Sequence, residues 1–123
     1  MTVTELYESI GGNYDSAKRI LQMDKLIAKF VVKFLDDKSC QSLLDAAAAG
    51  NAEEIFAGAH AMKGVCANLG LNSLSSAASD LAEEFRPGAA RTMDQAEVDR
   101  RVAALKEQYD KTIQGIRAFS ESQ

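Results

Sequence analysis

The only histidine of the chain, His60, is the residue with the clearest capacity for chemistry. An imidazole has an ordinary pKa of about 6.5, so it is largely neutral near pH 7, and the neutral ring is a competent nucleophile. Lys63 and Gly64 follow at the third and fourth positions, which on a helix places both one turn from the imidazole. A lysine ammonium at that spacing can balance the charge of a phosphoryl group on the ring. The three residues therefore predict a phosphoryl acceptor with a neutralising cation beside it.

The helix face that carries His60 is expected to be nearly bare and turned towards solvent. His60 lies about 100° around the helix from Ala59, which belongs to an apolar stripe expected to face the core: Ile55, Ala59, Met62, Cys66 and Leu69. Gly58 and Gly64 each cost roughly 0.5–1 kcal/mol relative to alanine inside a helix. We interpret both glycines as space for a partner protein beside the imidazole. A lone histidine in an alanine-rich helix is more often incidental, and Gly64 alone could serve helix packing, so the combination favours the site.

Capping residues divide the chain into predicted helices that would position this face. Helix starts precede apolar residues at three-and-four spacing, and they fall at Thr2 or Thr4, Asn13, Asp24, Ser39, Asn51, Asn72 or Ser73, and Thr92. Glycines are expected to end three of these helices, at Gly11-Gly12, Gly50 and Gly70. Asn51 with Glu54, and Thr92 with Gln95, have the spacing of a capping box. Residues 86–90 form the clearest loop.

The predicted fold class is all-α. Alanine, the best helix former, is abundant, and the alternation typical of strands is missing. The helices that open near Asp24, Asn51, Asn72 and Thr92 have the stripes of an antiparallel, up-down-up-down four-helix bundle, with short N-terminal helices added. Ile20 and Phe30 are among the apolar residues expected to face inward. We expect residues 1–123 to form one domain, with the core bundle roughly at 24–119.

Composition excludes several classes of function. The net charge of -4 argues against a nucleic-acid-binding protein, because binding a phosphate backbone needs a basic face. No apolar run approaches the roughly 20 residues that a membrane span needs, so a cytoplasmic protein is expected. Cys40 and Cys66 have no metal-ligand spacing, and Cys66 is expected to pack as a small apolar residue. No glycine-rich nucleotide loop and no metal-binding pattern is present, so neither a cofactor nor a metal site is predicted.

The segment HAMKGVCANLG, from His60 to Gly70, resembles the signature of histidine-containing phosphotransfer (HPt) domains. The shared pattern is a histidine, a lysine three residues on, a glycine next to it, and a hydrophobic-glycine pair that closes the helix. The helix order and the two short N-terminal helices also resemble bacterial stand-alone members, so the resemblance covers most of the chain. It implies that His60 accepts a phosphoryl group through its outward Nε2, that Lys63 neutralises the group, and that Gly64 leaves room beside the ring.

 

The same resemblance implies the partners. Similar domains take a phosphoryl group from the aspartate of a response-regulator receiver and pass it to another receiver, in pathways that begin at a sensor histidine kinase or hybrid kinase. They bind no cofactor, and the Mg²⁺ and acidic residues for the transfer belong to the receiver. They have no kinase or ATPase activity of their own. The long last helix could extend the bundle or reach a second subunit, and the first is more usual in the family, so a monomer is expected. Neither nucleic acid nor membrane is expected as a partner.

One position departs from the pattern of some relatives. In these, a glutamate or glutamine on the following helix holds the imidazole, and the corresponding residue here is Ala82. Ser79 or Glu83 could substitute if the helices are rotated slightly. An alternative function is also open: the same helical bundle could be an adaptor that binds a signalling partner without moving phosphate. A self-contained kinase has no support, because no nucleotide-binding segment and no paired catalytic carboxylates are found.

Overall fold

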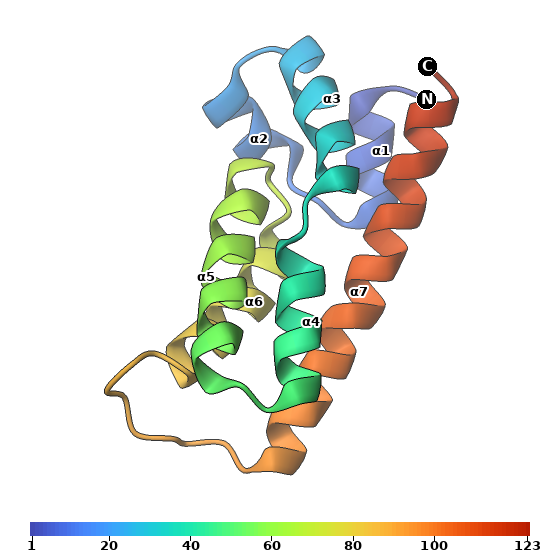
Figure 1. Cartoon of the computed structure of the whole chain (residues 1–123). Coiled ribbons are helices and arrows are strands. Elements are labelled where there is room, and N and C mark those ends of the chain that lie inside the picture. The colour runs from blue at the N-terminus through green and yellow to red at the C-terminus, as the bar shows by residue number, and fades with distance from the viewer.

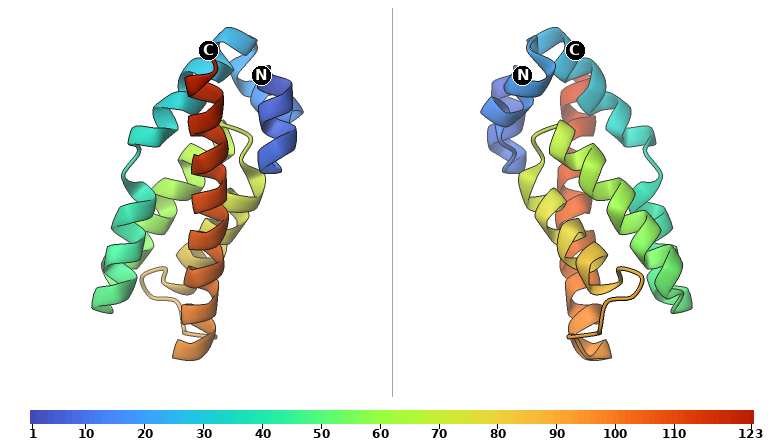
Figure 2. Two further views of the ribbon diagram at one scale, coloured as in Figure 1. Left: turned by 90° about the vertical axis from the view of Figure 1, so that its right-hand side faces the viewer. Right: turned by 90° about the vertical axis from the view of Figure 1, so that its left-hand side faces the viewer.

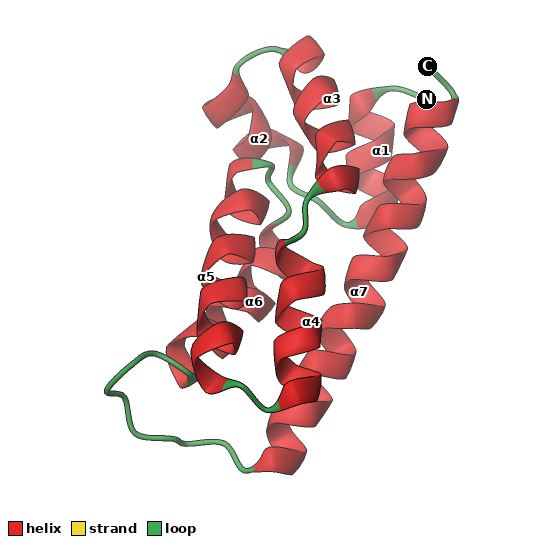
Figure 3. Cartoon of the chain, viewed as in Figure 1, coloured by secondary structure: helices red, strands yellow, loops and turns green.

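The computed structural model describes residues 1–123 and consists of helices joined by loops, with no strand (Figure 3). The predicted all-α class is confirmed. In chain order the elements are α1 (Val3–Ile10), α2 (Tyr14–Leu21), α3 (Asp24–Lys33), the 3-10 turn η1 (Phe34–Asp36), α4 (Ser39–Ala49), α5 (Ala52–Asn68), α6 (Asn72–Glu84) and α7 (Gln95–Glu121).

Most helix boundaries follow the local capping signals. Thr2 caps α1 in a complete capping box, and Asn13 and Asn51 cap α2 and α5 by accepting the amide three residues on. Three helices end where a glycine adopts a positive φ, which a residue without a Cβ does at no steric cost: Gly11, Gly50 and Gly70. These predictions are confirmed, because each depends only on residues within one turn of the boundary.

The predicted cap of α3 is wrong. Asp24 is the first residue of the helix, and the cap position belongs to Met23, which makes no side-chain hydrogen bond. The Asp24 carboxylate instead accepts hydrogen bonds from the Tyr14 hydroxyl and from Lys18 Nζ, the latter at 3.1 Å. The Asp24 side-chain oxygen that the local pattern assigned to the cap therefore binds residues of α2 instead.

The predicted start of the last helix is also wrong. The cap of α7 is Asp94, which accepts the Glu97 amide at 2.8 Å. Thr92 lies in the preceding loop, where its amide and hydroxyl donate to the buried Glu84 carboxylate at 2.9 and 2.6 Å, and the Met93 amide donates at 2.9 Å. A buried carboxylate needs such donors, so it holds the residues that would otherwise extend the helix.

The long helix α7 runs the length of the molecule and joins its two halves (Figures 1 and 2). The first three helices gather at the end where both termini lie. In the other half α4, α5, α6 and α7 contact one another in that order, α7 also contacts α4, and successive helices run in opposite directions (Figure 1). In this half α5 packs between α4 and α6, so the helix that carries His60 is held on two sides.

The predicted place of the helix that begins at Asp24 is wrong. α3 packs against α1, α2 and α7 and has no contact with α5, whereas α4 lies beside α5. The cause is a break in the chain at Asp37, whose backbone is extended and whose carboxylate accepts the Ser39 amide at 2.9 Å. This break redirects the chain, so α4 and not α3 becomes the neighbour of α5.

One cluster of buried apolar side chains joins the helices, and the whole predicted stripe of α5 belongs to it. Two residues expected to face inward do not: Ile20 is 51% exposed and Phe30 is 38% exposed. Both lie in the half formed by the short helices, where α2 buries only Ala17. No helix of the structure has the length and apolar character that crossing a membrane requires.

Candidate functional site

His60 lies in the middle of α5 and is exposed, while Ala59 and Met62 on the core-facing side are fully buried. The Asn51 cap and the αL residue Gly70 define the two ends of this helix. Because α4 and α6 hold its apolar stripe, the imidazole is presented to solvent from a rigid element. An exposed imidazole on such a helix can reach a group on another protein.

The imidazole is not surrounded by open space on every side. The Phe56 ring lies one turn before it, with the two ring centroids 5.5 Å apart and the planes inclined by 23°, so the rings are stacked. Phe56 is half-buried and packs against the hydrophobic core. Phe56 is not among the predicted site residues. An aromatic residue four positions before a helical histidine is the signal that could have found it, because helical side chains lean towards the preceding turn.

Lys63 lies one turn beyond His60 and is half-buried. All seven ion pairs of the molecule are formed by other residues, so its ammonium has no carboxylate partner. Its backbone carbonyl accepts a hydrogen bond from the Ser75 hydroxyl of α6 at 3.0 Å. This contact, which the sequence did not reveal, fixes the turn of α5 that carries the lysine and leaves the charged end available.

The two glycines of α5 have different surroundings. A Cβ built on Gly64 meets no atom within 4 Å, so this position borders open space next to His60. A Cβ built on Gly58 would lie 2.9 Å from the Leu43 amide nitrogen and 3.0 Å from its Cα. The interpretation of Gly58 as room for a partner is therefore wrong: it lets the backbones of α4 and α5 approach closely. Only Gly64 keeps the surface beside the imidazole free of a side chain.

No hydrogen bond of the structure orients the imidazole. Ala82, at the position where some relatives have an acceptor, is buried and apolar. Glu83 is exposed and pairs with Arg86, and Ser79 makes no side-chain hydrogen bond. The suggestion that Ser79 or Glu83 holds the ring therefore gains no support from the contacts observed.

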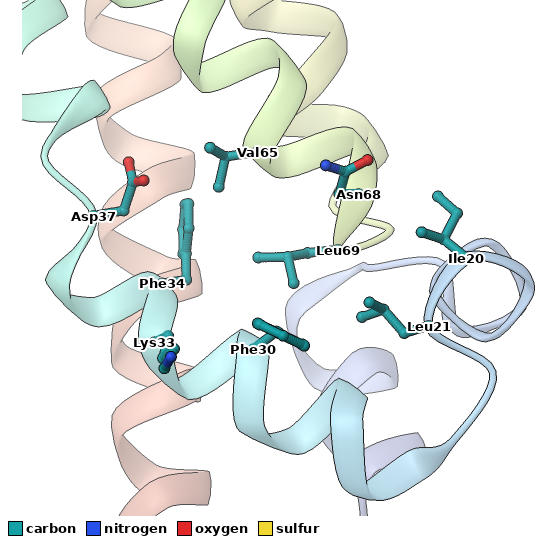
Figure 4. Close-up of a pocket in the computed structure, with 9 residues that line it drawn as sticks. All are labelled: Ile20, Leu21, Phe30, Lys33, Phe34, Asp37, Val65, Asn68 and Leu69. Carbon is teal, nitrogen blue, oxygen red and sulfur yellow. The ribbon is translucent and has the colours of Figure 1, made fainter.

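An apolar cavity of about 370 Å³ opens at the C-terminal end of α5, between this helix and the segment that contains α2 and α3 (Figure 4). Val65 and Asn68 of α5 and Leu69, the residue after the helix, line it, and Figure 4 shows Phe30 and Leu21 on the facing side. The exposed apolar residues Ile20 and Phe30 that the sequence placed inward line this cavity.

The remaining reactive groups form no second site. Cys40 and Cys66 are buried free thiols, and burial raises the pKa of both to about 12. A thiol with so high a pKa carries almost no thiolate, the reactive form, at neutral pH. No group of three or more histidine, cysteine, aspartate or glutamate side chains is placed to hold a metal ion.

The geometry defines an all-helical protein with a solvent-facing histidine, an unpaired lysine one turn away, and a glycine that leaves the surface between them open. The family model for the Hpt domain matches residues 16–115, and the chain therefore belongs to the Hpt domain family. The activity of this family is histidine phosphotransfer in two-component signalling. Comparisons with curated proteins and with solved structures find no match.

Proposed function

We propose that this protein is a phosphorelay carrier that accepts a phosphoryl group on His60 from the aspartate of a receiver domain and passes it to a second receiver. The observation that carries the proposal is the exposure of the only histidine beside an unpaired Lys63 and the open surface at Gly64. The helices α4 to α7 act as the up-down-up-down bundle that presents this face. The single domain and the cytoplasmic location stay predictions from the sequence, and the monomeric state stays a prediction from the family resemblance.

In the proposed transfer, this chain supplies only the nucleophile and a neutralising cation. The lone pair of Nε2 attacks phosphorus, the N–P bond forms as the P–O bond of the aspartyl phosphate breaks, the aspartate leaves as a carboxylate, and Nδ1 keeps its proton. Lys63 is one turn from the ring, where its ammonium can balance the charge on the phosphoryl oxygens. The Mg²⁺ for this transfer belongs to the receiver. The reverse reaction on a second receiver regenerates the imidazole.

The test of the acceptor is incubation of the chain with a receiver labelled on its aspartate. We expect the wild-type chain to take up the label in an acid-labile form, as a phosphohistidine does, and we expect His60→Gln to take up none while keeping its helical circular dichroism. Label that persists on the variant, or that survives acid, contradicts the proposal. Unchanged receiver affinity in His60→Gln, together with an unlabelled wild type, would identify an adaptor.

The role of Lys63 is tested by Lys63→Ala. We expect slower transfer or a shorter phosphohistidine lifetime with little change in thermal stability, because the ammonium makes no ion pair in the unphosphorylated chain. Lys111→Ala is the matched control, since Lys111 is an exposed lysine of α7 that pairs with Glu107. An equal effect of both substitutions would show that net charge, and not the position of Lys63, governs transfer.

The cavity beside α5 is proposed as part of the surface that the receiver covers. His60, Gly64 and Asn68 form one row of the helix, so the cavity residue Asn68 lies about 12 Å along the axis from His60. A protein partner covers roughly 800 Å², which is wide enough to include both. A receiver docked on His60 would therefore also meet the exposed apolar residues at the cavity.

The charge on this side of the molecule fits an acidic partner. Residues 14–38 contain six lysines and arginines against four acidic residues, although the whole chain is acidic. Lys33 lines the cavity, and Lys29 and Lys33 both lie 5.8 Å from the centroid of the Phe30 ring. Because opposite charges steer association, these lysines favour a partner with acidic residues around its phosphorylated aspartate.

Phe30→Ser tests this docking surface. We expect a higher KM for the phosphorylated receiver and an unchanged rate at saturation, because the substitution removes an exposed apolar contact distant from the imidazole. Met23→Ser is the control, since Met23 is 54% exposed but does not line the cavity. A KM that is unchanged in Phe30→Ser, or raised equally in both variants, would exclude the cavity from the interface.

A further inference from the structure

The Phe56 ring is stacked on the imidazole of His60. The stacked rings, 5.5 Å apart at their centroids, come from positions i and i+4 of α5, which lie on the same side of a helix. Because the core packs against Phe56, its ring has a fixed place. The imidazole therefore rests on a platform that is itself held by the protein.

Stacking leaves the reactive part of the imidazole free. It covers one face of the ring, whereas the lone pair of a ring nitrogen points outward in the ring plane. No hydrogen bond occupies either nitrogen, and Ala82 provides no acceptor on α6. A flat apolar contact can thus restrict the side-chain rotamers of the histidine without blocking the atom that attacks phosphorus.

We propose that Phe56 is the positioning residue for His60: its ring holds the imidazole plane so that a nitrogen edge faces the incoming phosphoryl group. The inference rests on the proposed role of His60 as the acceptor. Phe56 touches neither donor nor phosphoryl group and acts only through His60. Orientation of a nucleophile speeds its reaction because fewer unproductive conformations compete.

The test uses phosphoramidate, a small phosphoryl donor whose reaction with His60 does not depend on receiver docking. Phe56→Leu retains apolar volume but removes the flat ring, and Phe56→Tyr retains the ring. Phe85→Leu is the matched control, because Phe85 is also half-buried but does not stack on His60. The Arg91 guanidinium carbon lies over the Phe85 ring, 3.7 Å from the ring centroid. The rate of phosphohistidine formation and the NMR shifts of the imidazole protons are measured for all variants, alongside their thermal midpoints.

We expect labelling of Phe56→Leu to be about two- to tenfold slower, the range that corresponds to the contribution of one aromatic pair. Its imidazole protons should lose the upfield shift that the ring current of Phe56 causes. Phe56→Tyr should keep both the wild-type rate and the upfield shift, and Phe85→Leu should change neither. If Phe56 had a purely structural role, its substitution would change the thermal midpoint. The rate of phosphohistidine formation would then not depend on whether residue 56 is aromatic.

Three results would overturn the inference: a wild-type rate in Phe56→Leu, an equally slow Phe56→Tyr, or an equally slow Phe85→Leu. In each of these the wild-type chain is still labelled on His60, so the proposed function stands. A wild-type chain that takes no label on His60 from either donor overturns the proposed function, and the positioning role with it.

Discussion

Replacing Gly64 by alanine separates the stability of α5 from its function. A methyl group at this position meets no atom within 4 Å, so the helix gains roughly 0.5–1 kcal/mol from the better helix former without a steric cost. For a chain of this size the gain corresponds to a rise of roughly 2–4 °C in the thermal midpoint. The same methyl group stands next to His60, where the receiver of the proposed function would approach, so transfer from the receiver should fall by about tenfold or more.

The same substitution at Gly58 should have the opposite effect on stability. Its methyl group would lie 2.9 Å from the Leu43 amide nitrogen, a backbone atom that cannot rotate away. Overpacking of this kind costs about 1–3 kcal/mol, and the upper end applies because a whole helix must move. After subtraction of the gain in helix propensity, a net loss of about 2 kcal/mol remains.

Thermal unfolding followed by circular dichroism, with the phosphotransfer assay on the same samples, tests both substitutions. The two midpoints should move in opposite directions, and only Gly64→Ala should combine higher stability with slower transfer. Phosphoramidate should still label Gly64→Ala, which would show that the substitution impairs the approach of the receiver and not the reactivity of His60. A stabilised Gly58→Ala would refute the close packing of α4 on α5, and a destabilised Gly64→Ala would refute the open surface beside His60.

Three further predictions concern the rest of the molecule. Hydrogen bonds from the threonine and amide groups of the α6–α7 loop lower the pKa of Glu84. The stability that the Glu84 carboxylate contributes is therefore present at neutral pH and is lost as the pH falls through that lowered pKa. The difference in urea midpoint between wild type and Glu84→Gln should shrink in acid. Cys40 and Cys66 should resist iodoacetamide at pH 8 in the folded chain and react once urea unfolds it, because burial raises the pKa of both thiols to about 12. Tyr7→Phe should cost about 1–3 kcal/mol in thermal unfolding, since the buried Leu69 carbonyl loses the hydroxyl that donates to it at 2.6 Å.

Features that depend on neighbouring residues in the chain could be predicted from the sequence. Asn51 and Gly50 mark the turn between α4 and α5 through their own conformational preferences, and both predictions are confirmed. Asp24 and Thr92 failed as caps because their side-chain oxygens bind groups on other elements, Lys18 and Glu84. A capping pattern does not reveal such competition, because the competing donor or acceptor is set by the tertiary fold.

The choice of bundle helices failed for a related reason. The apolar stripe that contains Ile27 and Val31 is strong, and α3 does bury both residues. Periodicity shows that a helix has a buried face, but it does not show which helix that face meets. The break at Asp37 decides this, and the alanine-rich α4, with its weaker stripe, takes the place beside α5.

The positions of the two glycines of α5 can be predicted from helical spacing. Gly58 lies three residues after Ile55 and four before Met62, so the spacing alone places it on the core face, where close packing is its natural role. Gly64 lies two residues after Met62, on the far side of the helix. The apolar stripe of α5 alone therefore predicts a buried Gly58 and an exposed Gly64. The structure agrees, because Leu43 packs against Gly58 while Gly64 faces open space.

The distribution of ion pairs supports the same division of α5 into a held face and a free face. The surface of α7 carries a series of pairs between residues three or four apart, such as those of Glu97 with Arg100 and Arg101, whereas no residue of α5 takes part in an ion pair. A partner that covered α7 would have to remove water from these charges, which is costly. A partner that covers the α5 face meets His60, open space at Gly64 and one unpaired ammonium. Under the proposed function, the unpaired lysine therefore keeps its charge available for the phosphoryl group on His60.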